Sequence, residues 1–143
     1  MSYGRRWRAG RASRIASLPL GYADGWSRAY WPDAVALVRG RRVPLVGVVA
    51  MDSLMADVTD VPGVGLEDEL VLLGEQGEER ITADDLAHTR TTISWEVLTS
   101  MAQRLPRVYH ARAVPMAVRT LPGEIGKAGA PAERPADEGE QDG

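Results

Sequence analysis

Two glycines, Gly21 and Gly25, enclose the tripeptide Tyr-Ala-Asp at 22–24, and this arrangement constrains the local fold more than any other part of the sequence. Glycine adopts backbone conformations that residues with a Cβ avoid, so the pair predicts a tight, shaped turn. An apolar segment at 15–18 leads into the turn, and Arg28 follows it. The turn is expected to present a tyrosine, an aspartate and an arginine together. Shape alone favours a hairpin turn with an aromatic residue at its rim, and a functional site is the alternative.

Short strands are expected to dominate the rest of the chain. Apolar or alternating segments separated by glycine and proline predict them at residues 14–20, 34–38, 43–50, 54–58, 69–73, 108–113 and 114–121. Residues 75–80 are mostly charged and predict a loop.

Two short helices are also expected. The first spans 82–87 and begins with a capping-box pattern, in which Thr82 and Asp85 bind free N–H groups of the first turn. The second runs from about 94 to 104 and ends before Pro106. Apolar side chains recur at helical spacing along it, at Trp95, Leu98, Ala102 and Leu105.

Composition places the chain among soluble globular proteins. It has 143 residues, 44% of them hydrophobic and 26% charged. No apolar run reaches the ~18 residues of a membrane span. The absence of cysteine excludes disulfides and is compatible with a cytoplasmic location, and the two histidines predict no metal site.

We expect a mainly β domain over 1–121, a small curled sheet or β-barrel-like fold with two short helices, and a disordered Gly/Pro/acidic tail over 122–143.

Charge is distributed unevenly along the chain. Residues 1–42 hold nine arginines against two aspartates, a net charge of +7, whereas residues 43–143 have a net charge of −10. A basic arm of this kind is typical of proteins that bind nucleic acid or another polyanion. A solvated arginine-rich surface is the alternative.

Five motifs in order resemble those of the C-terminal domain of pyridoxal-phosphate-dependent alanine racemases. They are Ser-Tyr-Gly at 2–4, Gly-Tyr-Ala-Asp-Gly at 21–25, Val-Gly-Val-Val-Ala-Met-Asp at 46–52, Ile-Ser-Trp-Glu-Val-Leu at 93–98 and Arg-Leu-Pro-Arg-Val-Tyr at 104–109. The resemblance covers residues 2–121. It implies interconversion of L- and D-alanine through a pyridoxal phosphate aldimine in a homodimer, with D-alanine supplied to peptidoglycan. Alanine and serine remain open as the amino acid substrate, and nucleic acid is not an expected partner.

The resemblance implies roles for individual residues. Tyr3 matches the tyrosine that acts as the second base across the dimer interface, whose pKa neighbouring cations must lower from about 10. Tyr22 matches a residue that narrows the entrance to the active site, and Arg28 matches a polar residue of the same entrance corridor. A turn aromatic and a surface arginine are the alternatives. Met51 matches a residue whose backbone N–H binds the substrate carboxylate, although a core methionine is an equal alternative. Asp52 is expected to orient that loop.

Two positions depart from the family pattern. Val48 stands where an arginine is usual, which alters the charge of the entrance corridor. Trp95 replaces a tyrosine that contacts the cofactor phosphate. An indole N–H still donates a hydrogen bond but cannot accept one, so a phosphate contact of altered geometry and a core aromatic are both open for Trp95.

The chain lacks the family's cofactor lysine, which lies in an N-terminal (β/α) barrel. The only lysine, Lys127, falls in the predicted tail. We therefore expect the chain to be inactive alone and to be the C-terminal domain of a longer racemase, cut at a misassigned GTG start or a real truncation. Two alternatives are a separately encoded half that joins a barrel-only partner, and a non-catalytic β module whose basic arm binds an anionic partner.

Overall fold

The computed structural model describes residues 3–111, 114–120 and 125–127. The chain separates into two compact units, Met1–Gln103 and Arg104–Gly143. Each unit is described by itself.

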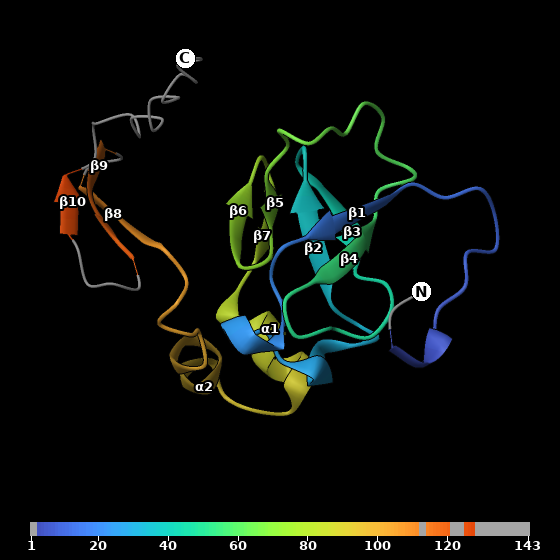
Figure 1. Ribbon diagram of the computed structural model, residues 1–143, viewed down its shortest axis with the longest axis horizontal. Coiled ribbons are helices and arrows are strands. Elements are labelled where there is room, and N and C mark those ends of the chain that lie inside the picture. The colour runs from blue at the N-terminus through green and yellow to red at the C-terminus, as the bar shows by residue number, and fades with distance from the viewer. Residues whose placement is uncertain (1–2, 112–113, 121–124, 128–143) are drawn as a thin grey trace, which may run out of the picture. The chain divides into compact units, whose positions relative to one another are not determined.

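Three small antiparallel sheets build the first unit (Figure 1). Strand β1 (Ile15–Leu18) pairs with β4 (Leu54–Asp57). Strand β2 (Val35–Val38) lies between β3 (Arg41–Pro44) and β5 (Leu70–Val71). Strands β6 (Gly74–Gln76) and β7 (Glu79–Ile81) form a hairpin. A bridge between Leu45 and Ala56 connects the chain beyond β3 to β4, so the sheets curl around one core without closing into a barrel.

The core of this unit is built by residues from every sheet and both helices. Its largest fully buried side chains are Trp26, Tyr30, Leu37, Val38, Val58 and Val97. Strand β4 alternates buried and half-buried residues, which confirms the period-2 pattern predicted for it. The prediction of a mainly β fold with two short helices is confirmed.

The helices follow the last strand of this unit. Helix α1 spans Ala83–Arg90 and helix α2 spans Ser94–Thr99. The predicted capping box is confirmed: the Asp85 amide donates to Thr82 Oγ1 at 3.1 Å, and the Thr82 amide donates to Asp85 Oδ2 at 2.8 Å. Three short 3-10 turns, η1 (Tyr3–Arg5), η2 (Tyr22–Asp24) and η3 (Arg28–Tyr30), complete the unit.

Several local predictions are wrong. The first helix was predicted to end at residue 87 but runs to Arg90, and the strand predicted over 69–73 covers only Leu70–Val71. Helix α2 ends at Thr99 instead of Arg104, because the Ala102 amide donates to the Asp24 carbonyl at 2.9 Å instead of continuing the helix. The charged segment 75–80 is not a loop but most of the β6–β7 hairpin, which turns at Gly77 with φ 64°. The strand predicted over 43–50 stops at Pro44.

The second unit contains one three-stranded antiparallel sheet in the order β10–β9–β8. Strand β8 spans Arg107–Ala111 and β9 spans Val114–Arg119. Within the segment predicted as a disordered tail, Ile125–Lys127 forms β10 and pairs with β9. The other residues of 122–143 lie outside the described residues, and the domain boundary at 121 stays a prediction.

Candidate functional site

The turn between the two motif glycines is held from inside. The buried Asp24 carboxylate accepts a hydrogen bond from the Gly21 amide at 2.8 Å, and the Trp26 amide donates to the Gly21 carbonyl at 3.2 Å. Gly25 has φ 97°, a left-handed conformation that favours glycine. The tight turn is therefore confirmed. It is not a hairpin turn, because β1 before it pairs with β4 and not with the next strand. Asp24 is a buried part of its framework and is not presented with Tyr22 and Arg28.

Backbone hydrogen bonds tie this turn to the loop after residue 49. The Tyr22 amide donates to the Ala50 carbonyl and the Ala23 amide to the Met51 carbonyl, both at 3.0 Å. A Cβ on Gly21 would lie 2.3 Å from the Ala50 carbonyl oxygen, so only glycine allows this approach. Two motifs far apart in sequence are thus joined through their backbones.

Met51 is exposed at the surface. Its relative accessible area is 50%, so the alternative of a core methionine is wrong. The Met51 carbonyl is bonded to Ala23, but the Met51 N–H donates to no acceptor among the residues that the structure describes. Asp52, the next residue, is also exposed.

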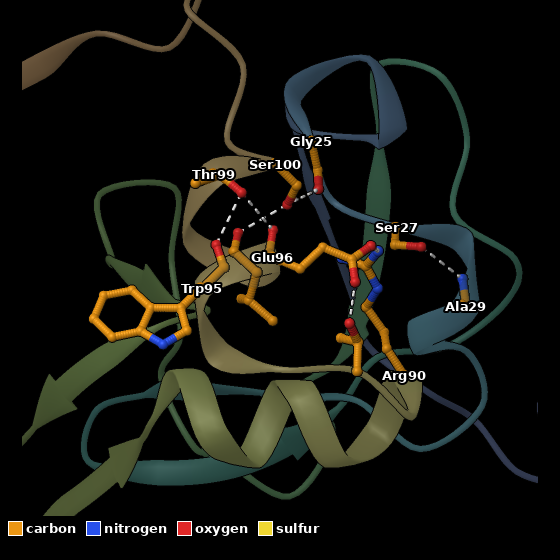
Figure 2. A network of polar contacts seen from close by, with 10 residues as sticks. Gly25, Ser27, Ala29, Arg90, Trp95, Glu96, Thr99 and Ser100 are labelled. Atoms are coloured by element: carbon orange, nitrogen blue, oxygen red, sulfur yellow. Dashed lines mark hydrogen bonds and ion pairs between the residues drawn. The ribbon is translucent and has the colours of Figure 1, made fainter.

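Tyr22 and Arg28 lie together beside that loop. The Tyr22 side chain is 37% exposed, and the Arg28 guanidinium carbon lies 5.9 Å from the centroid of its ring, within cation–π range. Ser27 starts the η3 turn, because its hydroxyl accepts from the Ala29 amide at 3.2 Å (Figure 2). An aromatic surface and a positive charge are thereby presented next to the Met51 backbone.

Tyr3 begins the η1 turn, and only its backbone is described. An open, mainly apolar cavity of about 670 Å³ separates this turn from the loop and strand that follow residue 47. Its lining residues are Gly4, Arg5, Val48, Ala50, Ser53, Leu54 and Met55. Val48, which replaces the expected arginine, is buried. The structure thus brings the Tyr3 segment to the same loop that carries Met51.

Trp95 lies on α2 at a different cavity. Its side chain is 72% exposed, so the alternative of a core aromatic is wrong, and Val97 is the residue of this helix that is buried. The cavity beside it measures about 270 Å³ and is lined by Asp84, Ala87, His88, Thr92, Ile93, Ser94 and Trp95. The helix contacts the motif turn through the Ser100 hydroxyl, which donates to the Gly25 carbonyl at 3.3 Å.

Two carboxylates with shifted pKa values serve local structure. The Arg39 guanidinium, which donates to Asp68 at 2.7 Å, lowers the pKa of that carboxyl, and the Gly65 amide contributes. The Thr82 hydroxyl and amide lower the pKa of Asp85. Within the described residues, no group of three or more His, Cys, Asp and Glu side chains is arranged to hold a metal ion. No helix in the described part of the chain could span a membrane.

The family model described as the alanine racemase C-terminal domain matches residues 1–109. The chain belongs to this family. An alanine racemase from Sorangium cellulosum is 50% identical over 113 residues, covering 76% of this chain and 30% of the relative. One from Halothermothrix orenii is 47% identical over 109 residues, covering 76% and 29%. The chain therefore spans less than a third of the length of these relatives.

Solved alanine racemases share the fold. The Bacillus anthracis enzyme with bound L-Ala-P superposes with a TM-score of 0.78 at 36% identity, covering 84% of this chain and 30% of that one. The Bartonella henselae enzyme, with covalently bound pyridoxal phosphate, gives a TM-score of 0.68 at 29% identity, covering 77% and 30%.

Sequence reasoning missed two features of this region. The first is the internal role of Asp24, for which the position of an aspartate three residues after Gly21 was the available signal. The second is a cluster of Tyr30, Arg90 and Glu96 behind the motif turn. No motif connects these three residues, because they meet only through the packing of α1.

Proposed function

We propose that this chain is the C-terminal part of an alanine racemase and interconverts L- and D-alanine when joined to a barrel domain. One observation carries the proposal. The glycine-flanked turn is hydrogen-bonded to Ala50 and Met51, and this leaves the Met51 N–H unbonded among the described residues, beside Tyr22 and Arg28. The product D-alanine would be supplied to peptidoglycan, and the enzyme would work as a cytoplasmic homodimer.

The residues of the proposed site have three roles, which are proton transfer, substrate binding and control of access. Tyr3 exchanges a proton with the α-carbon of alanine, on the partner subunit's side of the dimer interface. The Met51 N–H binds the substrate carboxylate, and Asp52 orients its loop. Tyr22 and Arg28 line the entrance, where the Arg28 cation attracts the carboxylate of an incoming amino acid.

The residues present fit the periphery of a pyridoxal phosphate site but not its covalent attachment. We assign to Trp95 a hydrogen bond from its indole N–H to the phosphate, and its exposure supports this assignment. When bound, pyridoxal phosphate acts as an electron sink for the charge that develops on the α-carbon. The only lysine, Lys127, belongs to β10 of the second unit. We therefore expect the attaching lysine to come from the barrel, as part of the same protein or as a separate chain.

A chimera tests this proposal. The segment of the Sorangium cellulosum relative that precedes its match to this chain is fused in front of the 143 residues, and formation of D-alanine from L-alanine is measured. We expect activity in the fusion and none in the chain alone. Mixing the two parts as separate polypeptides tests the two-chain arrangement. A folded fusion that binds pyridoxal phosphate but forms no D-alanine would contradict the proposal.

The role of Tyr3 is tested in the same fusion. Tyr3→Phe removes the hydroxyl that transfers the proton, so we expect activity to fall at least about a hundredfold. Tyr109→Phe is the matched control, because Tyr109 is half-exposed on β8 and has no proposed role. Equal activities of these two variants would exclude Tyr3 as the base.

A further inference from the structure

Helix α2 has only six residues, too few to be stable without external contacts. Val97 anchors it in the core, and the Ser100 hydroxyl reaches the Gly25 carbonyl. These contacts fix the middle and the end of the helix. The part of α2 that carries Trp95 and Glu96 needs a further contact. Figure 2 shows this part of the helix and the residues around it.

That contact is with a guanidinium from the neighbouring helix. Arg90 is the last residue of α1, and its side chain is only 14% exposed. Its Nη2 atom lies 3.1 Å from Glu96 Oε1, within an ion pair (Figure 2). The Thr92 hydroxyl donates to the other carboxylate oxygen of Glu96. The first turn of α2 is therefore held through one carboxylate.

The same guanidinium also contacts the η3 turn. Its carbon lies 5.4 Å from the centroid of the Tyr30 ring, within cation–π range. Tyr30 is fully buried, ends the turn that Arg28 begins, and packs on Trp26 with ring centroids 4.4 Å apart. Arg90 Nη1 is buried and has no hydrogen-bond partner in the described part of the chain. The electron-rich ring face of Tyr30 therefore compensates part of the guanidinium charge that no hydrogen bond meets.

We propose that Arg90 is a positioning residue that couples the η3 turn, which carries Arg28, to helix α2, which carries Trp95. A single guanidinium contacts both elements, so displacement of one element weakens the contact of Arg90 with the other. The roles of Arg28 and Trp95 as entrance and phosphate contacts rest on the proposed function. The coupling between η3 and α2 does not.

Hydrogen exchange on the full chain tests the coupling. The reporters are the amides of Val97, Ser100 and Ala102, normalised to amides of the β2–β3 pair so that global unfolding is removed. Arg90→Met keeps the apolar stem but loses the charge, and we expect exchange at these amides to rise about tenfold. Arg39→Met is the matched control, since it breaks an ion pair with Asp68 and should leave α2 unchanged.

Variants of Tyr30 separate coupling from simple stabilisation. Its hydroxyl is buried without a partner among the described residues, so Tyr30→Phe keeps the ring and should not alter exchange in α2. Tyr30→Leu removes the ring and should raise that exchange about tenfold. In the Arg90→Met background, Tyr30→Leu should add nothing at α2, because the coupling is already lost. Additive effects of the two substitutions, or an unchanged α2 in Arg90→Met, would overturn the proposal.

The chimera provides a functional readout. Arg90→Met should weaken binding of pyridoxal phosphate several-fold, because Trp95 is no longer held, and Arg90→Lys should restore part of it by keeping the Glu96 pair. A wild-type fusion without activity would refute the proposed function and leave the exchange comparison intact. An active fusion with unchanged cofactor binding in Arg90→Met would refute the link between Arg90 and the site.

Discussion

The η2 turn and helix α2 both carry predicted site residues, but they are held in different ways. The turn is fixed by backbone hydrogen bonds to Ala50 and Met51 and by a glycine that no other residue can replace. The helix is fixed by side chains, chiefly Val97, Glu96 and Arg90. A backbone-bonded element depends on conformation at a few positions, whereas a side-chain-bonded element depends on the identity of its neighbours.

The largest effect is expected where the turn meets the 50–51 loop. Gly21→Ala places a Cβ 2.3 Å from the Ala50 carbonyl oxygen, so the turn and the loop must separate. We expect a loss of more than about 3 kcal/mol in the free energy of unfolding, measured by urea denaturation. Gly10→Ala is the matched control, because a Cβ added at Gly10 would meet nothing within 4 Å. Similar losses in both variants would show that the backbone contact does not hold the turn.

A gain of stability is expected at the junction of the two helices. Thr91 caps α1 in a left-handed conformation, with φ 57°, which a β-branched residue adopts only under strain. Thr91→Gly should therefore raise the free energy of unfolding by about 1 kcal/mol, seen as a higher melting temperature. Thr91→Ala keeps the Cβ and should gain less. A destabilised glycine variant would contradict the assigned strain.

The capping box gives α1 a dependence on pH. Hydrogen bonds from Thr82 lower the pKa of Asp85 in the folded chain. The ionised Asp85 carboxylate therefore stabilises the fold fully at pH values above its ordinary pKa of 3.8. That stabilisation is lost as pH falls through the lowered folded value. Thr82→Ala should cost about 1 kcal/mol at pH 7 and should flatten this part of the stability profile. If the free energy of unfolding of Thr82→Ala followed the same pH dependence as that of the wild type, the Thr82–Asp85 contribution would be excluded.

The smallest effect on stability is expected at Trp95. Its side chain is 72% exposed, so Trp95→Ala should change the free energy of unfolding by less than about 0.5 kcal/mol. Val97→Ala, two residues away and fully buried, should cost about 2 kcal/mol. If denaturation curves gave the same loss in the free energy of unfolding for both variants, Trp95 would contribute to the stability of the helix. In the chimera, Trp95→Ala should nevertheless weaken binding of pyridoxal phosphate.

Local chemistry could be predicted from the sequence, and long-range packing could not. The capping box of Thr82 and Asp85 and the alternation in β4 depend on residues a few positions apart, and both are confirmed. The length of α2 was overestimated because Trp95 and Leu98 have helical spacing in sequence, yet both are exposed. Spacing alone does not reveal which face of a helix is covered, and the contact from Ala102 to Asp24 that ends the helical segment joins residues far apart in the chain.

The candidate site follows the same division. The motifs identified Tyr22, Arg28 and Met51 as residue types, and the turn geometry was predicted from its glycines. The burial of Asp24 could not be predicted, because its carboxylate accepts the Gly21 hydrogen bond only once the turn has closed. The hydrogen bond from Tyr22 to the Ala50 carbonyl requires β1 and β4 to pair in their observed register, which no local pattern encodes.

The motif turn is joined to the loop at Ala50 and Met51 by hydrogen bonds between backbone atoms, which allows the side chains there to be engineered. Both hydrogen bonds use carbonyl oxygens at positions 50 and 51, so they do not depend on which side chain stands there. A library that varies the exposed Met51 side chain, together with Tyr22 and Arg28, would resize and recharge the proposed entrance while the Met51 N–H stays in place. If the proposed function holds, substrate preference would then be retuned separately from binding of the carboxylate.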